Sequence, residues 1–125
     1  MSDRGYLLDT HIFLWDLADD KRISKVHDEI LLGDAPKFLS VASLWEIAIK
    51  SATGKLSMPD KLLETIEASD VELLPILPRH VLQTTSLPRH HGDPFDRLLI
   101  AQAQLEELTL VTADGHFSNY DVTLA

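Results

Sequence analysis

Short apolar runs alternate along the chain with longer segments that have helical spacing. Apolar runs of this kind are typical of strands buried in a parallel sheet. They occupy 6–8, 37–40, 71–76 and 108–112, and 121–124 is a candidate for a last edge strand. The predicted helices occupy 10–17, 24–32, 41–50, 60–68 and 78–86, and another begins at 94. Strands that alternate with helices predict an α/β sandwich around a mainly parallel sheet.

The last of these helices is predicted to be buried, and its N-terminus carries two acids. Asp93 precedes Pro94, which is the order expected of an N-cap followed by a proline at the first helical position. Asp96 falls in the first turn, where the helix dipole stabilises a negative charge. From 95 to 103 most side chains are apolar, so other elements must cover this helix.

The segment 41–50 carries a single acid, Glu46, beside an apolar stripe at helical spacing. The stripe consists of Val41, Leu44, Trp45, Ala48 and Ile49. Trp45, like Trp15 on the segment 10–17, is expected to pack in the core rather than to stack on a nucleobase.

Composition narrows the possible partners. The 125 residues fit one domain, 1–125, and include 11 basic and 20 acidic residues, which gives a net charge of −9. Bulk attraction to nucleic acid is therefore excluded, so an RNA or DNA substrate requires a divalent cation or a local basic patch. The lack of cysteine excludes disulfides and thiolate zinc sites and suits a cytoplasmic protein. No signal peptide or membrane span is expected, because the apolar runs fall far short of ~20 residues.

Four acids are candidates for one metal site. Asp9 and Asp114 each follow the C-terminal end of a predicted strand, where open α/β sheets bind their ligands. Asp96 opens the helix that leads to the strand before Asp114, and Glu46 can reach the same edge from its helix. Carboxylates gathered in one place repel one another unless a cation lies between them, and oxygen ligands favour Mg²⁺ or Mn²⁺. Such a site can activate water for phosphodiester hydrolysis.

Each acid also has a purely structural interpretation. Asp9 can end its strand and cap the following helix, and Asp96 can be a first-turn acid and no more. Glu46 can pair with Lys50 at i,i+4, and Asp114 can be a turn residue before a glycine.

Four motifs, in this order, resemble those of PIN-domain ribonucleases, and most of all the VapC-type toxins of bacterial toxin–antitoxin pairs. The motifs are Tyr6-Leu7-Leu8-Asp9-Thr10, Ser43-Leu44-Trp45-Glu46-Ile47-Ala48, Asp93-Pro94-Phe95-Asp96-Arg97-Leu98-Leu99-Ile100-Ala101 and Leu110-Val111-Thr112-Ala113-Asp114. The resemblance implies a three-layer α/β/α sandwich with a five-stranded parallel sheet. It also implies a dimeric Mg²⁺- or Mn²⁺-dependent endoribonuclease that a small antitoxin inhibits.

By motif position, the resemblance makes the four acids Asp9, Glu46, Asp96 and Asp114 the metal ligands and catalytic residues. The third motif holds both Asp93 and Asp96, and the distance from Asp96 to the fourth motif matches the family better. Thr10 and Thr112 would hydrogen-bond the acids or a water molecule of the site.

The substrate contacts are less well defined. Arg89, His91 and Arg97 are candidates for contact with phosphate, because an acidic protein needs local positive charge near its substrate. Three other classes stay open from the residues: a phosphohydrolase with an aspartyl nucleophile, a phospho-receiver signalling domain and a catalytically silent binding module. The first class usually needs a second acid two positions after the first, and this chain has His11 at that position.

Overall fold

A four-stranded parallel sheet forms the centre of the computed structural model, which describes residues 4–90 and 92–125. The strands are β1 (Tyr6–Leu8), β2 (Lys37–Ser40), β3 (Val71–Leu74) and β4 (Thr109–Val111). Their order is β3-β2-β1-β4, and Leu8 of β1 lies opposite Leu39 and Val111. All four strands therefore end at the same edge of the sheet.

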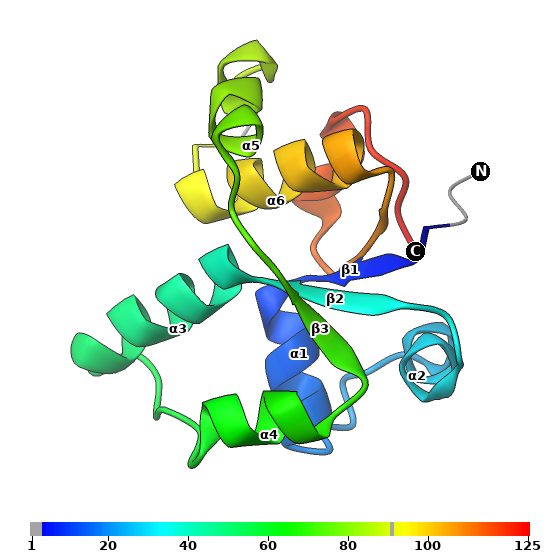
Figure 1. The fold of residues 1–125 in the computed structure, drawn as a ribbon, viewed down its shortest axis with the longest axis vertical. Coiled ribbons are helices and arrows are strands. Elements are labelled where there is room, and N and C mark those ends of the chain that lie inside the picture. The colour runs from blue at the N-terminus through cyan, green and yellow to red at the C-terminus, as the bar shows by residue number, and fades with distance from the viewer. Residues whose placement is uncertain (1–3, 91) are drawn as a thin grey trace.

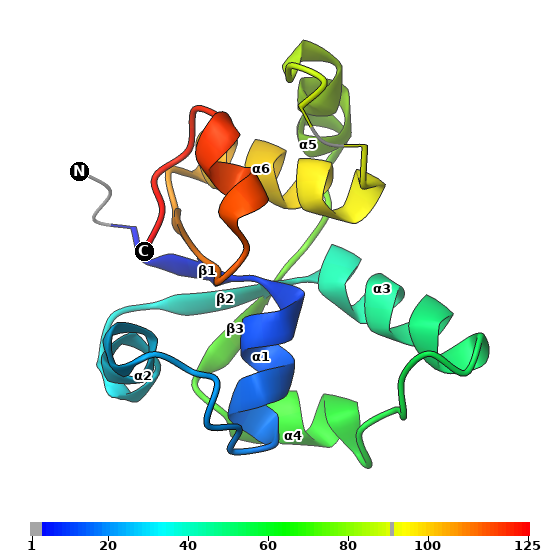
Figure 2. The ribbon, with the colours of Figure 1, turned by 180° about the vertical axis from the view of Figure 1, so that it is seen from behind.

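Helices cover both faces of this sheet, as Figures 1 and 2 show. They are α1 (Thr10–Leu17), α2 (Lys25–Leu32), α3 (Val41–Ala52), α4 (Leu62–Ala68), α5 (Pro78–Gln83) and α6 (Pro94–Glu106), with 3₁₀ turns η1 (Thr84–Ser86) and η2 (Gly115–Asn119). The helices α5 and α6 lie on one side of the sheet, and α1, α2 and α4 lie on the other (Figure 1). The predicted α/β/α sandwich is confirmed.

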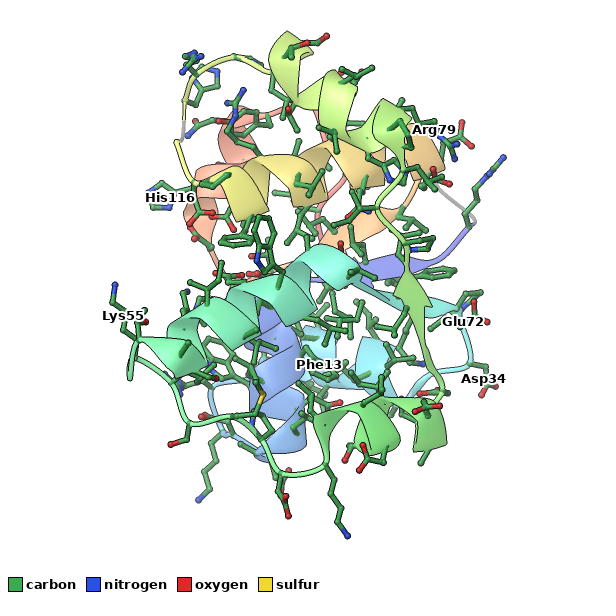
Figure 3. All side chains as sticks on the ribbon, turned by 60° about the vertical axis from the view of Figure 1, so that its left-hand side comes forward. Phe13, Asp34, Lys55, Glu72, Arg79 and His116 are labelled. Atoms are coloured by element: carbon green, nitrogen blue, oxygen red, sulfur yellow. The ribbon has the colours of Figure 1, made fainter. Side chains whose placement is uncertain are left out.

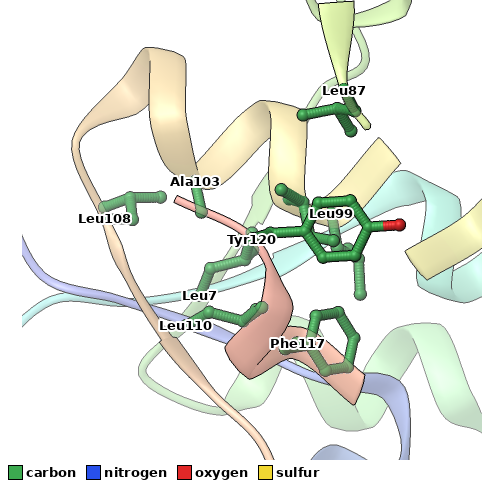
Figure 4. Close-up of a cluster of buried hydrophobic side chains, with 9 residues drawn as sticks. Leu7, Leu87, Leu99, Ala103, Leu108, Leu110, Phe117 and Tyr120 are labelled. Atoms are coloured by element: carbon green, nitrogen blue, oxygen red, sulfur yellow. The ribbon is translucent and has the colours of Figure 1, made fainter. Parts of the chain in front are cut away.

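The alternation of side chains along the strands divides the core into two clusters. Leu7 and Leu110 face α6 and pack in the cluster of Figure 4, while their neighbours Leu8 and Val111 face α1 on the opposite side. All four side chains are fully buried, and each such leucine or valine contributes roughly 1.5–3 kcal/mol to folding. Both layers of helices are thus fixed to the strands that carry the site.

Two helix caps lie where the sequence predicts them. The Ser24 side chain accepts a hydrogen bond from the His27 backbone N–H at the start of α2. Asp93 caps α6 in the same way. Neither cap depends on distant residues, which is why the local pattern was sufficient to predict it.

Four of the predicted elements differ from the structure in their extent or type. Segment 121–124 forms only an isolated bridge between Leu124 and Leu110 in place of a fifth strand, because the Gln104 side chain bonds the carbonyl of Asp121 and holds the chain toward α6. Strand β3 ends before Pro75, which has no N–H to donate. Helix α4 begins after Lys61, whose left-handed φ of 50° takes the place of the predicted Asp60 cap. The predicted helix 78–86 tightens into η1 after α5.

Within the described residues, no helix combines the length and the apolar character needed to cross a membrane.

Candidate active site

Asp9 lies directly after β1 at the carboxyl edge of the sheet, between two neighbouring strands. Its backbone N–H donates to the Val111 carbonyl of β4 at 2.9 Å. Its side-chain oxygen Oδ2 accepts a hydrogen bond of 2.8 Å from the Thr112 hydroxyl. The parallel pairing of β1 with β4 thus brings together two residues that lie far apart in the sequence.

Glu46 reaches the same edge from α3, and the Thr10 hydroxyl lies against its carboxylate. The Thr10 hydroxyl lies 2.7 Å from Glu46 Oε1 and 2.8 Å from Ser43 Oγ. Since Thr10 has one hydroxyl proton, it donates to the carboxylate and can accept from Ser43. Asp9 and Glu46 are each only 4% exposed, so two acids are buried at this edge.

Burial raises the pKa of the Asp9 carboxyl above its ordinary value. The Thr112 hydrogen bond and the charge of His11 lower this pKa in part, and the negative charge of Glu46 raises it again. The two carboxylates therefore interact electrostatically through an interior that screens charge poorly.

Lys50 provides positive charge beside these acids. It lies one turn after Glu46 on α3, and its Nζ is 2.8 Å from Glu46 Oε2. Hydrogen bonding to Glu46 raises the pKa of Lys50, and the charges of Asp93 and Asp96 raise it further. The acids at the start of α6 thus act on the same ammonium group as Glu46.

The two acids of the third motif differ in their tasks. Asp93 Oδ1 accepts hydrogen bonds from the backbone N–H groups of Phe95 at 2.8 Å and of Asp96 at 3.1 Å. Asp93 is therefore the N-cap of α6. Asp96 stands in the first helical turn, as predicted, and is partly buried.

Asp114 is joined to Asp9 through Thr112. Its backbone N–H donates to the Thr112 hydroxyl oxygen at 3.0 Å. Its carboxylate caps η2 by accepting from the His116 N–H at 2.9 Å, and the same oxygen lies 2.6 Å from His116 Nδ1. Asp114 therefore has the structural turn role that the sequence allows. Its role as a metal ligand stays a prediction.

The donor chemistry around Asp9 and Glu46 fits a hard divalent cation. Within 4–90 and 92–125, no three His, Asp or Glu side chains converge to hold a metal ion among them. Magnesium, however, retains several waters and is commonly bound through one or two carboxylates. The buried pair of carboxylates, with the Thr10 and Thr112 hydroxyls beside it, meets that smaller requirement.

Arg97 has a structural task in the described chain. Its guanidinium donates to the carbonyls of Thr84 and Pro88, both at 2.8 Å, and of Leu87 at 3.2 Å. These contacts tie the segment after α5 to α6 and favour a structural role over the predicted substrate contact. The candidate His91 lies outside the described residues.

The prediction that Trp45 packs in the core is wrong. Its side chain is 58% exposed and makes an edge contact with Phe95, with ring centroids 5.2 Å apart. Helix α3 instead buries the opposite face, with Ala42, Ser43, Glu46 and Ile47. The polar members of that face are tolerated because Thr10 and Lys50 satisfy them. Trp15, by contrast, is partly buried against the core cluster that contains Leu8 and Val111, and the guanidinium carbon of Arg22 lies 4.7 Å from the centroid of its ring.

Two residues near the acids were not predicted from the sequence, Ser43 and His116. Ser43 precedes Glu46 by three positions, so the i,i+3 spacing on a helix was an available signal. His116 contacts Asp114 but has no such pattern. Figure 3 shows His116 and Lys55 at the same side of the molecule, where α6 begins and α3 ends, and Asp34 at the opposite side.

The fold and these residues define a class: parallel α/β domains with acids at the carboxyl edge of the sheet. A family model described as PIN domain matches residues 6–122, and the chain belongs to that family. This membership removes the phospho-receiver and the aspartyl phosphohydrolase from consideration.

Solved structures share the fold at low sequence identity. VapBC2 from Rickettsia felis, bound to a DNA fragment from its promoter, has a TM-score of 0.72 and 20% identity, with 97% of each chain covered. FitAcB from Neisseria gonorrhoeae has a TM-score of 0.66 and 23% identity, with 95% of each chain covered. VapBC-5 from Mycobacterium tuberculosis has a TM-score of 0.63 and 22% identity, covering 98% of this chain and 96% of that one. No curated protein matches the chain.

Proposed function

We propose that this protein is a VapC-type toxin, a divalent-metal-dependent endoribonuclease that hydrolyses RNA phosphodiester bonds in the cytoplasm. The observation that carries the proposal is the pair Asp9 and Glu46, two buried carboxylates at one edge of the sheet, where the negative charge of Glu46 adds to the effect of burial in raising the pKa of Asp9. A bound dication would relieve the repulsion between the two carboxylates. Membership of the PIN family and the motif order support the same activity.

Each residue has a defined task in this proposal. Asp9 and Glu46 bind the cation, Mg²⁺ or Mn²⁺, while Asp96 on α6 and Asp114 in the loop after β4 add negative charge around this pair. Thr112 fixes the Asp9 carboxylate and Thr10 fixes that of Glu46, each through a hydrogen bond shorter than 3 Å. When bound, the cation supplies Lewis acidity that activates water and stabilises charge on the phosphoryl group.

The protein itself must provide positive charge for an anionic substrate, because its net charge is −9. Lys50 and Lys55 line a hollow of about 260 Å³ next to Glu46, together with His11. Cations placed beside the acids can hold the RNA backbone in position while the rest of the surface repels nucleic acid. We therefore expect the protein to contact only a short stretch of the RNA backbone at the site, and not a long stretch along its surface.

We further propose two protein partners, an antitoxin and a second copy of the chain. The acidic surface suits a basic antitoxin segment, and the similar protein from Mycobacterium tuberculosis is described as a member of a family of toxin–antitoxin systems. The second copy would cover the exposed face of α3, which presents Val41, Trp45 and Ile49. Contiguous exposed apolar side chains of this size commonly mark protein interfaces.

The proposal is tested with two measurements on the partner-free protein: calorimetric titration with Mn²⁺ and cleavage of a 5′-labelled RNA. We expect Asp9→Asn and Glu46→Gln to abolish measurable Mn²⁺ uptake and to lower cleavage at least about a hundredfold, because metal ligands are removed without a change of shape. Asp34→Asn at the opposite side of the molecule is the matched control and should behave as the unsubstituted protein. Full Mn²⁺-dependent cleavage by both site variants would contradict the proposal.

A further inference from the structure

We propose that Lys50 is an internal counter-ion that occupies Glu46 in the metal-free protein, is displaced when a dication binds, and then contacts the substrate phosphate. This inference rests on the proposed function, because it assigns a positioning residue to the same site. The ion pair between Lys50 and Glu46 is therefore a state of the resting protein and not only a contact that stabilises α3.

The geometry places Lys50 where it competes with a cation. Its Nζ lies 2.8 Å from Glu46 Oε2, while Oε1 of the same carboxylate accepts from Thr10 at 2.7 Å. Both oxygens of Glu46 are thus engaged, and the ammonium is the one cationic partner among these contacts. A dication that binds Glu46 must take over the charge compensation that Lys50 provides.

The charges around Lys50 explain why it rests at this position. Glu46 on α3 pairs with its ammonium directly, and the negative charges of Asp93 and Asp96 at the start of α6 act on the same group. Lys50 thus neutralises part of an acidic region between α3 and α6, where the carboxylates would otherwise repel one another.

Lys50 also has a place to move to. Its side chain is 39% exposed, and it lines the hollow that Lys55 and His11 share beside Glu46. A flexible four-carbon stem allows the ammonium to leave Glu46 without a change in the α3 backbone. In the hollow it would stand with Lys55 as a pair of cations, the chemistry that binds a phosphate group of the RNA backbone.

The exchange predicts opposite effects on two measurements. Lys50→Met should bind Mn²⁺ about three- to tenfold more tightly in calorimetric titration, since a partly buried ion pair no longer competes. The same variant should cleave labelled RNA at least about tenfold more slowly at saturating Mn²⁺, because the substrate phosphate loses a cation. A Lys50 with only a structural task would lower both quantities together.

Two matched variants separate the charge from the side chain. Lys50→Arg keeps a cation at Glu46 and should restore Mn²⁺ affinity to within about twofold of the unsubstituted protein. Lys55→Met removes a lysine that lines the hollow without an ion pair to Glu46 among the described residues, so it should weaken RNA binding and leave Mn²⁺ affinity unchanged.

A measurement on the unsubstituted protein covers the case in which Lys50→Met does not fold. With ¹³Cε-labelled lysine, the resonance of Lys50 should shift on addition of Mg²⁺, while that of Lys55 should shift on addition of RNA. An Lys50 resonance that ignores Mg²⁺, or a folded Lys50→Met with equal or weaker Mn²⁺ affinity, would overturn the inference. Absence of Mn²⁺ uptake by the unsubstituted protein would instead overturn the proposed function.

Discussion

Thr112 Oγ1 donates a hydrogen bond of 2.8 Å to Asp9 Oδ2, and the same hydroxyl oxygen accepts the N–H of Asp114 at 3.0 Å. One buried side chain therefore joins the ends of β1 and β4 and couples two of the predicted acids. Because the hydroxyl donates to the charged form of Asp9, it lowers the pKa of that carboxyl against the effect of burial.

Thr112→Val should therefore raise the pKa of Asp9 further. An acid with a higher pKa loses its proton at higher pH, so the pH at which the protein binds Mn²⁺ half-maximally should move upward. The isosteric change also leaves the Asp114 N–H without its acceptor and should cost about 1–3 kcal/mol of stability. Calorimetric titration from pH 5 to 8 and urea unfolding measure the two effects. Thr109→Val, on the same strand pairing but away from Asp9, is the control, and an identical pH profile for Thr112→Val would contradict the prediction.

Glu106→Gln should weaken the contact between α5 and α6 in a pH-dependent way. Hydrogen bonds from His80 at 2.8 Å and from Arg79 at 2.7 Å lower the pKa of Glu106, which is 22% exposed. A carboxylate with a lowered pKa in the folded state adds stability above its unfolded pKa, and this stability is lost as pH falls through the folded value.

At pH 7 we expect the Glu106→Gln variant to be less stable by about 1–2 kcal/mol, and we expect the difference to shrink as the pH falls below 4.5, the ordinary pKa of a glutamate, toward the folded value. Thermal unfolding across this pH range provides the measurement. Glu107→Gln is the matched control, since its pair with Arg4 is 65% exposed on both sides and exposed pairs contribute little. A stability loss that stays the same from pH 7 to the acid end of the range would indicate lost packing instead.

Arg97→Lys separates a structural role from a substrate role. A lysine cannot reach three carbonyls at once as the planar guanidinium does, so stability should fall by about 1–2 kcal/mol. The affinity for Mn²⁺ should stay unchanged, and RNA binding should change only as far as the fraction of folded protein does. Urea unfolding measures the stability, and filter binding of labelled RNA measures the affinity for RNA. Weak RNA binding by a fully stable variant would instead support the predicted contact of Arg97 with phosphate.

Trp45→Ala should break the proposed dimer. An exposed tryptophan at the centre of an apolar face commonly dominates an interface, so the dimer dissociation constant should rise more than tenfold in analytical ultracentrifugation. Leu32→Ala removes another exposed apolar side chain, on α2, and should leave dimerisation unchanged. A monomeric unsubstituted protein would remove the basis for this prediction.

Much of the architecture follows from local pattern. Apolar runs such as 6–8 and 37–40 predict buried strands, and the Asp93-Pro94 step predicts the start of α6, because strand burial and capping depend on neighbours in sequence. The position of Asp9 after its strand was predictable for the same reason. Segment 121–124 was not, because a side chain of α6 decides how the chain runs there.

The sequence by itself therefore determined the parallel α/β framework, the place of Asp9 after β1 and that of Asp96 in the first turn of α6. The tertiary structure decided which face α3 buries: periodicity favours the stripe with Trp45, whereas the carboxyl edge of the sheet offers Thr10 as a partner for Glu46. It also decided that Thr112 donates a hydrogen bond to Asp9, and that the negative charges of Asp93 and Asp96 act on Lys50. Hydrogen bonds and charges between residues distant in sequence have no periodic signature, so only the folded chain reveals them.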